Sequence, residues 1–223
     1  IVDIRPAAGE SARTLAADRQ IEVLSGHAVV DTKGRRRIKG VSVMKLGEDG
    51  QPTSMVRDLG CDLVAVSGGW SPAVHLHCHA GGKVVYDEVG GCFLPGETAE
   101  AARSVGAGNG ELELAACLEK GWQAGLSAAS DTGFRKPGRD PKSPTASRRD
   151  TVPPVHLWII PAKPGEENKA KRFVDFQNDV TEADVRLAAR EGYQSVEHLK
   201  RYTTLGMGTD QGKTSNIPGL AIL

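Results

Sequence analysis

Small apolar residues recur at helical spacing near the end of the chain. The stripe follows the i, i+3, i+4 pattern of an amphipathic helix and consists of Val185, Ala188 and Ala189. Thr181 precedes the stripe and Asp184 stands three residues later, which is the arrangement of a helix capping box. Gly192 is placed to end this helix in a left-handed conformation, and Ser195 can cap a second helix that runs to about Tyr202. The pattern therefore predicts two short consecutive helices.

Apolar runs of strand length occur in the first part of the chain and again near residue 155. Alternation of polar and apolar residues predicts two antiparallel arms, residues 35–44 and 53–58, joined by a turn rich in glycine. A continuous apolar run at 61–67 ends in two glycines, which is typical of a buried parallel strand. Shorter strands are expected at residues 1–5, 21–24, 27–30 and 155–160. The strand at 155–160 is expected to rejoin the first domain.

Two further helices are expected upstream, one over residues 11–19 and a longer, alanine-rich one over residues 112–129. The N-terminus of the longer helix would present its positive dipole end to an anion such as a pyrophosphate. Residues 135–154 contain six Lys or Arg against two Asp, together with five prolines, and show no apolar periodicity. This composition predicts a linker or surface crossover.

The composition narrows the range of partners. Lys plus Arg equals Asp plus Glu at 28 each, so no long-range charge favours nucleic acid. No run of about 18 apolar residues exists, which argues against a membrane partner. The four cysteines show no paired spacing, which predicts neither a zinc ribbon nor a disulfide framework and favours a reducing, cytoplasmic location. Ile1 already lies within a strand-like run, so we expect the chain to be a fragment.

Residues 206–216, here called the donor-rich loop, combine three glycines with two threonines, a serine, a lysine and a glutamine. Such a loop offers many backbone N–H groups and hydroxyls to an anion, for example a phosphate. The ending Gly212-Lys213-Thr214 invites comparison with a nucleotide-binding P-loop, but Met207 stands where the first glycine of that motif would fall. We therefore reject the P-loop and leave open an unspecialised interdomain turn.

Two polar features earlier in the chain are weaker candidates for a binding site, one for a metal ion and one for a dinucleotide. His75, His77 and His79 would share one face of a strand, but three imidazoles along a strand span too far to close around one ion. We expect these histidines to line a groove or a subunit surface and predict no metal site. Asp3 ends a short strand, where a dinucleotide-binding unit would hold a ribose hydroxyl; a solvated carboxylate is the alternative.

A family resemblance is carried by the sequences DFQNDVT and VEHLKRYTTLGMGTDQGKTSN. They resemble the bacterioferritin-associated ferredoxin-like domain, in which C-x-C and C-x4-C pairs bind a [2Fe–2S] cluster. Four other residues occupy those cysteine positions in this chain, namely Asp175, Gln177, Asp210 and Ser215. No iron–sulfur cluster is therefore expected. This cluster-less version is similar to the alpha subunits of heterotetrameric sarcosine oxidases.

Upstream segments resemble flavoprotein reductases that have two dinucleotide-binding domains. Residues 61–72 resemble the second conserved strand of that fold and its turn, although AVSGGWSPAVHL, with Trp70, is more similar to the sarcosine oxidase alpha pattern. RSVGAGNG resembles the third conserved element. Ala107 stands where flavin reductases carry an aspartate for the ribityl chain, which argues against a standard FAD site. The resemblance implies that NAD binds instead, lined by Gly106, Ala107, Asn109, Leu112 and Leu114.

The resemblance implies an α/β fold class. Residues 1–134 would be part of the Rossmann-like, NAD-binding reductase domain, and residues 135–168 a basic, proline-rich linker with one strand. Residues 169–216 would form a small all-α, helix-turn-helix-like module without a cluster. Residues 217–223 would begin an aminomethyltransferase-like domain that is missing from this chain.

For function, the resemblance implies an oxidoreductase acting on CH–NH groups. The complete heterotetramer would oxidatively demethylate sarcosine to glycine with O₂ and, through the missing domain, tetrahydrofolate. Amine oxidation would take place in the beta subunit, with gamma and delta subunits completing the assembly. No catalytic residue is assigned in this chain, which we expect to be inactive alone.

The resemblance also implies an FMN at the interface of the alpha and beta subunits. The side chains expected to face its phosphate or its neighbourhood are Thr203, Thr204, Gln211, Lys213, Thr214 and Ser215. Two alternatives remain open. One is the alpha subunit of a related amine, opine or proline dehydrogenase, or of a cyanide-forming glycine dehydrogenase; the other is a non-catalytic assembly scaffold.

Overall fold

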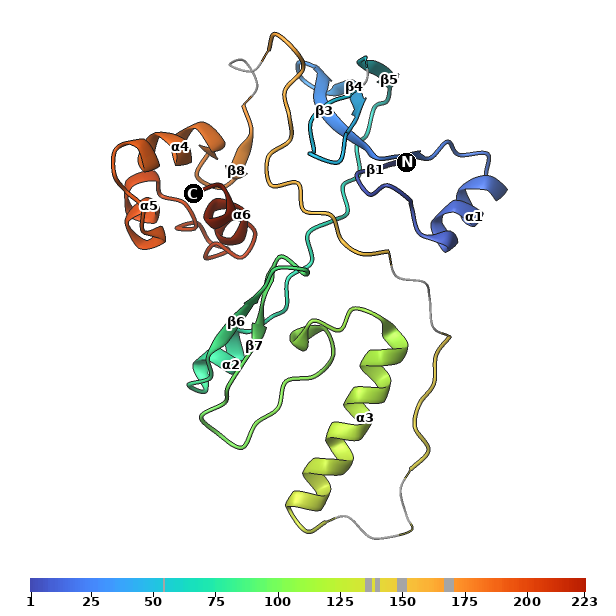
Figure 1. Cartoon of the computed structure of the whole chain (residues 1–223), viewed down its shortest axis with the longest axis vertical. Coiled ribbons are helices and arrows are strands. Elements are labelled where there is room, and N and C mark those ends of the chain that lie inside the picture. Colours follow the sequence, from blue (N-terminus) through green and yellow to red (C-terminus); the bar gives the residue numbers. More distant parts are fainter. Residues whose placement is uncertain (54, 135–137, 139–140, 148–151, 167–170) are drawn as a thin grey trace. The chain divides into compact units, whose positions relative to one another are not determined.

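The computed structural model describes residues 1–53, 55–134, 138, 141–147, 152–166 and 171–223 (Figure 1). Helices and strands are mixed, as the α/β expectation requires. The chain divides into two compact units, one formed by residues 1–8, 16–65 and 155–223 and the other by residues 9–15 and 66–154. The division falls within helix α1 (Glu10–Asp18), which confirms the short helix expected near residue 11.

The main sheet of the first unit is an antiparallel meander in the order β3-β4-β5. Its strands are β3 (His27–Gly34), β4 (Ile38–Lys45) and β5 (Arg57–Gly60). The two predicted arms do pair, but the second begins at Arg57 rather than at residue 53. The central position of β4 explains the burial of five consecutive residues along it.

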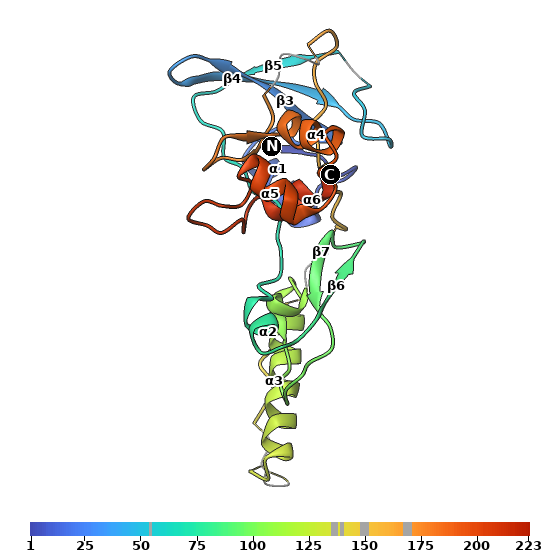
Figure 2. The same ribbon diagram turned by 90° about the vertical axis from the view of Figure 1, so that its left-hand side faces the viewer.

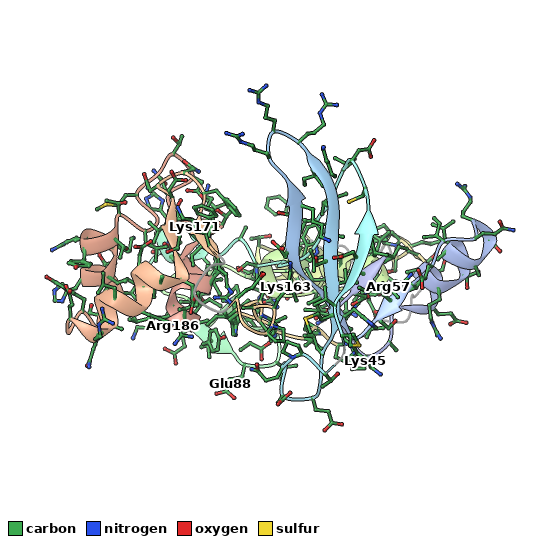
Figure 3. All side chains as sticks on the ribbon, turned by 90° about the horizontal axis from the view of Figure 1, so that it is seen from above. Lys45, Arg57, Glu88, Lys163, Lys171 and Arg186 are labelled. Carbon is green, nitrogen blue, oxygen red and sulfur yellow. The ribbon has the colours of Figure 1, made fainter. Side chains whose placement is uncertain are left out.

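One side of this meander packs against residues 157–163, in the later part of the predicted linker region. Ala28 and Met44 are buried, and Leu157 and Ile160 pack against them. Lys163 forms an ion pair with Asp31, which lowers the pKa of that carboxyl; Lys163 is labelled in Figure 3. The expected strand at residues 155–160 is wrong, because this segment has no strand pairing, but its expected return to the first domain is confirmed.

A parallel pair, β1 (Val2–Asp3) and β2 (Leu24–Ser25), lies near the start of the chain. The carboxylate of Asp3 is bound by the guanidinium of Arg5, with 2.7 Å between Asp3 Oδ2 and Arg5 Nη2. This contact lowers the pKa of Asp3 and uses the oxygens that a ribose hydroxyl would need.

Besides the first part of α1, the described residues of the second unit include a hairpin, a short helix, a long helix and a 3₁₀ turn (Figure 2). The hairpin pairs β6 (Val84–Asp87) with β7 (Cys92–Pro95), and the helical elements are α2 (His75–His79), η1 (Gly106–Asn109) and α3 (Leu114–Asp131). Helix α3 confirms the long helix expected near residue 112. The buried strand expected at 61–67 is wrong: this run has no strand pairing, and Leu63 and Val66 are 76% and 89% exposed.

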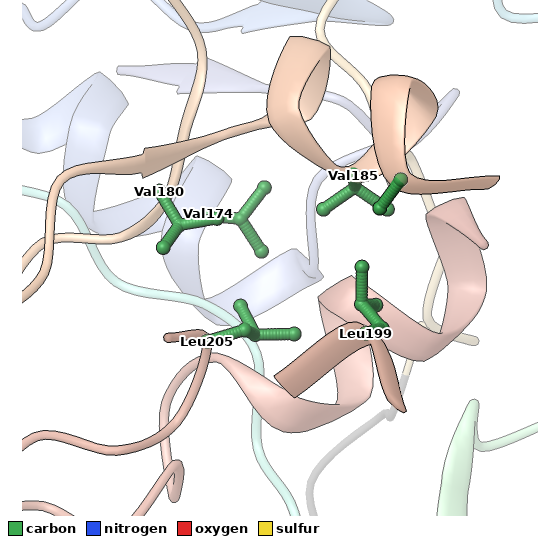
Figure 4. Packing of buried hydrophobic residues seen from close by; sticks show 6 residues of the cluster. Val174, Val180, Val185, Leu199 and Leu205 are labelled. Atoms are coloured by element: carbon green, nitrogen blue, oxygen red, sulfur yellow. The ribbon is translucent and has the colours of Figure 1, made fainter. Parts of the chain in front are cut away.

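Residues 171–223, here called the C-terminal module, build a separate core from short elements. Strands β8 (Phe173–Asp175) and β9 (Val180–Thr181) pair antiparallel and precede α4 (Glu182–Arg190), α5 (Val196–Thr203) and α6 (Asn216–Ile222). The buried core consists of Val174, Val180, Val185, Ala188, Leu199 and Leu205 (Figure 4). The module is therefore not all-α as expected, since a short strand pair supplies two of these side chains.

Local signals set the two ends of α4. Thr181 and Asp184 form the predicted capping box: the Asp184 backbone N–H donates to Thr181 Oγ1, and the Thr181 backbone N–H donates to Asp184 Oδ2 at 2.8 Å. At the other end, the N–H groups of Gly192 and Tyr193 donate to the carbonyls of Ala189 and Ala188. This is the pattern of a Schellman cap, and Gly192 has the positive φ of +95° that such a cap uses.

The last residues of the chain pack as part of the C-terminal module. Residues 217–223, expected to begin another domain, lie mostly in α6, and Ile222 and Leu223 pack against the core of the module. Gly219 lies so close to Leu205 that an added Cβ would be 2.4 Å from its Cδ2 atom. Within the part of the chain that the structure describes, no helix has the length and apolar character needed to span a membrane.

The capping geometry makes Thr181 a testable determinant of module stability. Thr181→Ala removes the side-chain acceptor for the Asp184 N–H and should lower the free energy of unfolding by about 1 kcal/mol. Ser195→Ala is the matched control, because Ser195 stands at the N-cap of α5 without a side-chain cap hydrogen bond. Thermal denaturation followed by circular dichroism measures both. Equal losses in the two variants would contradict the assigned role of the capping box.

Candidate functional site

A single buried carboxylate connects the β8–β9 turn to the donor-rich loop. Asp175 is 2% exposed. Its Oδ1 atom accepts the backbone N–H groups of Gln177 at 2.8 Å and Asn178 at 3.2 Å. Its Oδ2 atom accepts the N–H of Gly206 at 2.8 Å and the hydroxyl of Ser215 at 3.4 Å. One side chain therefore fixes the turn and both ends of the loop.

The other positions at which the resemblance places cysteines also make hydrogen bonds to this loop. Gln177 Oε1 accepts the backbone N–H of Thr209 at 2.7 Å. Asp210 accepts the N–H of Gly212 at 3.1 Å, and its other oxygen accepts the Thr214 hydroxyl at 2.7 Å. These hydrogen bonds, the side-chain bond from Thr214 first, hold the pKa of Asp210 below its ordinary value. Three of the four expected cysteine positions, 175, 177 and 210, are therefore occupied by residues that accept hydrogen bonds. The fourth, Ser215, donates its hydroxyl to Asp175.

The side chain of Asn216 packs against two glycines of the same loop. Gly206 and Gly212 have positive φ angles of +68° and +75°, which glycine adopts without strain. A Cβ at either position would lie 2.3 Å or 2.2 Å from Asn216 Oδ1. Asn216 Oδ1 is buried and has no hydrogen-bond partner among the described residues. The close packing explains why glycine is required at both positions.

Some of the side chains expected near FMN already form hydrogen bonds within the module, whereas others are exposed. Thr203 donates its hydroxyl to the carbonyl of Leu199 at 2.7 Å, and Thr204 ends α5 with a left-handed backbone. Thr214 is engaged by Asp210, and Ser215 is buried with its hydroxyl directed to Asp175. Gln211 and Lys213 are exposed. Within the described residues, no hydrogen bond or ion pair engages the ammonium group of Lys213.

The residues expected to line NAD gather at the start of α3. Gly106, Ala107 and Asn109 lie in η1, and Gly106 has a φ of +67°. Leu112 and Leu114 follow with 62% and 63% of their surface exposed. The structure therefore brings together a turn with a glycine-type backbone and two uncovered apolar side chains.

The N-terminus of α3 is already capped by a carboxylate. Glu113 Oε2 accepts the backbone N–H of Ala116 at 2.9 Å. A negative charge at this place interacts favourably with the helix dipole and disfavours a second anion there. The Ala116 N–H is therefore not free to bind the pyrophosphate expected at this helix end.

The three histidines do not share a strand face, because they lie in helix α2. His77 is buried, with its Nε2 atom 2.8 Å from the carbonyl oxygen of Lys83, whereas His75 and His79 are exposed. The geometric argument from a strand is therefore wrong. Among the described residues, no three His, Cys, Asp or Glu side chains are grouped closely enough to hold a metal ion.

The sequence pattern did not predict a shallow hollow of about 290 Å³ on the C-terminal module. Its lining comes from β9, α4, α5 and the turn before β9, and consists of Asn178, Asp179, Val180, Asp184, Leu187, Tyr202 and Thr203. Asp184 is engaged by the capping box, and Tyr202 donates its hydroxyl to Glu191 at 2.6 Å. The polar lining therefore largely serves the helix ends.

Comparison with solved structures first defines the class of fold. The chain is similar to L-proline dehydrogenase from P. horikoshii, with a TM-score of 0.61 and 18% identity over 99% of this chain and 43% of that one. At this identity the likeness concerns the fold alone. It agrees with the general α/β expectation.

Sequence comparison then identifies the particular relatives. Residues 169–223 match the Sarcosine oxidase A3 domain. The whole chain is 33% identical to sarcosine oxidase subunit alpha of Corynebacterium sp. (strain P-1) and 37% identical to that of Rhizobium meliloti (strain 1021). The chain spans 23% and 21% of the lengths of these two relatives. The predicted resemblance to sarcosine oxidase alpha subunits is confirmed.

The packing of Asn216 between two glycines predicts a specific cost of substitution. Gly212→Ala introduces a Cβ 2.2 Å from Asn216 Oδ1 at a φ of +75°, so both a clash and backbone strain should destabilise the module. Gly192→Ala is the matched control, because its φ is +95° but nothing lies within 4 Å of the added Cβ. Denaturant unfolding should show a loss for Gly212→Ala that exceeds the control by about 1 kcal/mol or more. Equal losses would show that strain alone operates.

Proposed function

We propose that this chain is part of the alpha subunit of a sarcosine oxidase, an oxidoreductase acting on CH–NH groups. The observation that carries the proposal is similarity over the entire chain, at 33–37% identity, to three relatives named sarcosine oxidase subunit alpha. In this proposal the complete enzyme converts sarcosine to glycine with O₂ and tetrahydrofolate. It does so in the cytoplasm, as an assembly with beta, gamma and delta subunits.

Within that assembly the proposed role of this chain is cofactor binding and subunit contact, not bond-making chemistry. The carboxylates of the C-terminal module that are enclosed by the fold serve hydrogen bonds, as Asp175 and Asp184 do. A general acid or base needs a free oxygen that can reach a substrate. We therefore propose that the chain is inactive alone, and that the beta subunit carries the amine oxidation.

The proposed FMN contact rests on Lys213. The backbone N–H groups of Gly206, Gly212 and Thr214 donate to the carboxylates of Asp175 and Asp210, so they are not free to hold a phosphate. The exposed ammonium group of Lys213 can supply the positive charge that a phosphate requires. Gln211, also exposed, can add a side-chain donor.

Replacing Lys213 in the assembled enzyme tests this contact. Lys213→Ala should reduce the FMN that remains bound after gel filtration and raise the dissociation constant of FMN by about tenfold, since one charge-assisted contact is lost. Flavin is released by acid and quantified by chromatography, which makes the measurement independent of turnover. Lys200→Ala, on α5 of the same module, is the control. Unchanged FMN content in Lys213→Ala would sink the proposed contact.

The proposed NAD contact rests on the start of α3. Leu112 and Leu114 leave most of their apolar surface uncovered, and the backbone at Gly106 can approach a ligand closely. A nicotinamide or adenine ring can cover such apolar side chains. The capped helix end argues that the ring, and not the pyrophosphate, lies nearest to Glu113.

Calorimetric titration of the full-length subunit with NAD⁺ tests this second contact. Leu114→Ser should weaken NAD⁺ binding by about tenfold, because roughly 1.5–3 kcal/mol accompanies burial of a leucine side chain. Gln123→Ala, more than two turns further along α3, should leave binding unchanged. The absence of binding heat with the unsubstituted subunit would instead favour an assembly scaffold whose dinucleotide site is vestigial.

A further inference from the structure

We propose that the carboxylate of Asp175 acts as a built-in anion around which the donor-rich loop closes, so that the C-terminal module folds without a metal cluster or an external ligand. The inference concerns the folding of the module and goes beyond the proposed cofactor contacts.

The contacts of Asp175 are those of a bound anion. Three backbone N–H groups and one hydroxyl converge on its two oxygens, and they come from three separate stretches of the chain, at residues 177–178, 206 and 215. Oriented N–H groups of this kind form the concave sites in which proteins hold anions. Here the anion is a side chain of the same module, 2% exposed.

The charge of Asp175 is stabilised by dipoles rather than by a cation. Within the described residues, no Lys, Arg or His side chain forms an ion pair with this carboxylate. A buried ionised carboxylate is strongly unfavourable unless hydrogen bonds compensate for lost hydration. Its four donors supply that compensation, which makes the module dependent on their simultaneous presence.

The same donor arrangement does not suit a metal ion. A cation needs lone pairs that point towards it, whereas each oxygen of Asp175 already accepts two hydrogen bonds. N–H and O–H groups present positive hydrogen atoms to the centre of the site. The chemistry of the donors therefore favours negative charge at this position.

Asp210 has a related role at the surface of the loop. It accepts hydrogen bonds from Gly212 and Thr214 and so closes a turn of five residues. Its contacts are local, whereas those of Asp175 reach residues 31 and 40 positions away. Asp175 is therefore the residue on which closure of the whole loop depends.

Removing the carboxylate and returning it as a small molecule tests the proposal on the full 223-residue chain. Asp175→Ala should lower the Tm of the module by about 10 °C, because several donors lose their acceptor. The backbone amides of Gly206 and Gln177 should exchange with solvent at least about tenfold faster in hydrogen-exchange measurements. Formate, a carboxylate without the side chain, should restore much of both losses, whereas formamide, its neutral counterpart, should not.

Asp184→Ala is the matched control, because Asp184 also accepts a backbone N–H and a hydroxyl, but at a helix cap. It should lower the Tm without any recovery by formate beyond that seen for the unsubstituted chain in the same salt. If Asp175→Ala keeps the original Tm and exchange rates, or if formate restores no more than formamide, the proposal is overturned.

A second variant covers the case in which Asp175→Ala does not fold. Asp175→Asn keeps the shape of the side chain but removes its charge and places an amide donor against other donors. Faster exchange of the Gly206 amide, with unchanged exchange in strands β3 and β4, supports the built-in anion. Exchange equal to that of the unsubstituted chain shows that a neutral acceptor suffices, which overturns it.

Discussion

The structure of the C-terminal module depends on the burial of one charge. Asp175 is almost completely removed from water, and each of its oxygens must therefore be supplied with hydrogen-bond donors by the chain itself. That requirement explains the shape of the donor-rich loop, which returns to Asp175 at Gly206 and again at Ser215. Glycine at 206 and 212 then follows, because the loop closes tightly enough to enclose the Asn216 side chain.

Because hydrogen bonds within the module engage many donors of the loop, fewer of its groups remain available to other molecules. From composition alone, every backbone N–H and hydroxyl between residues 206 and 216 looked like a potential phosphate ligand. In the folded module many of these groups face Asp175, Gln177 or Asp210. Gln211 and Lys213 are among the side chains of the loop that remain exposed, and of these two Lys213 carries a positive charge. The proposed phosphate contact therefore moves from the backbone of the loop to the side chain of Lys213.

Elements whose determinants are local could be predicted from the sequence, and elements that need distant partners could not. The capping box at Thr181 and the helix near residue 114 depend on neighbours within a few residues, and both were predicted nearly at their true limits. The apolar run at 61–67 has the composition of a buried strand, but a strand exists only where another strand supplies its hydrogen bonds. The histidines were misplaced for a related reason, since an alternating pattern over five residues also fits a short helix.

The role of Asp175 in the candidate site also depends on distant partners and could not be predicted from neighbouring residues. Comparison with a cysteine-containing motif shows that residue 175 is not a thiolate ligand. It does not indicate what the Asp175 carboxylate does. The backbone N–H groups of Gln177, Asn178 and Gly206 and the hydroxyl of Ser215 all need an acceptor at this position. A short anionic side chain meets that need, whereas an apolar one would leave several buried N–H groups unsatisfied at about 1–3 kcal/mol each. The identity of residue 175 is therefore constrained by donors that lie 31 to 40 positions away along the chain, which local sequence reasoning does not reach.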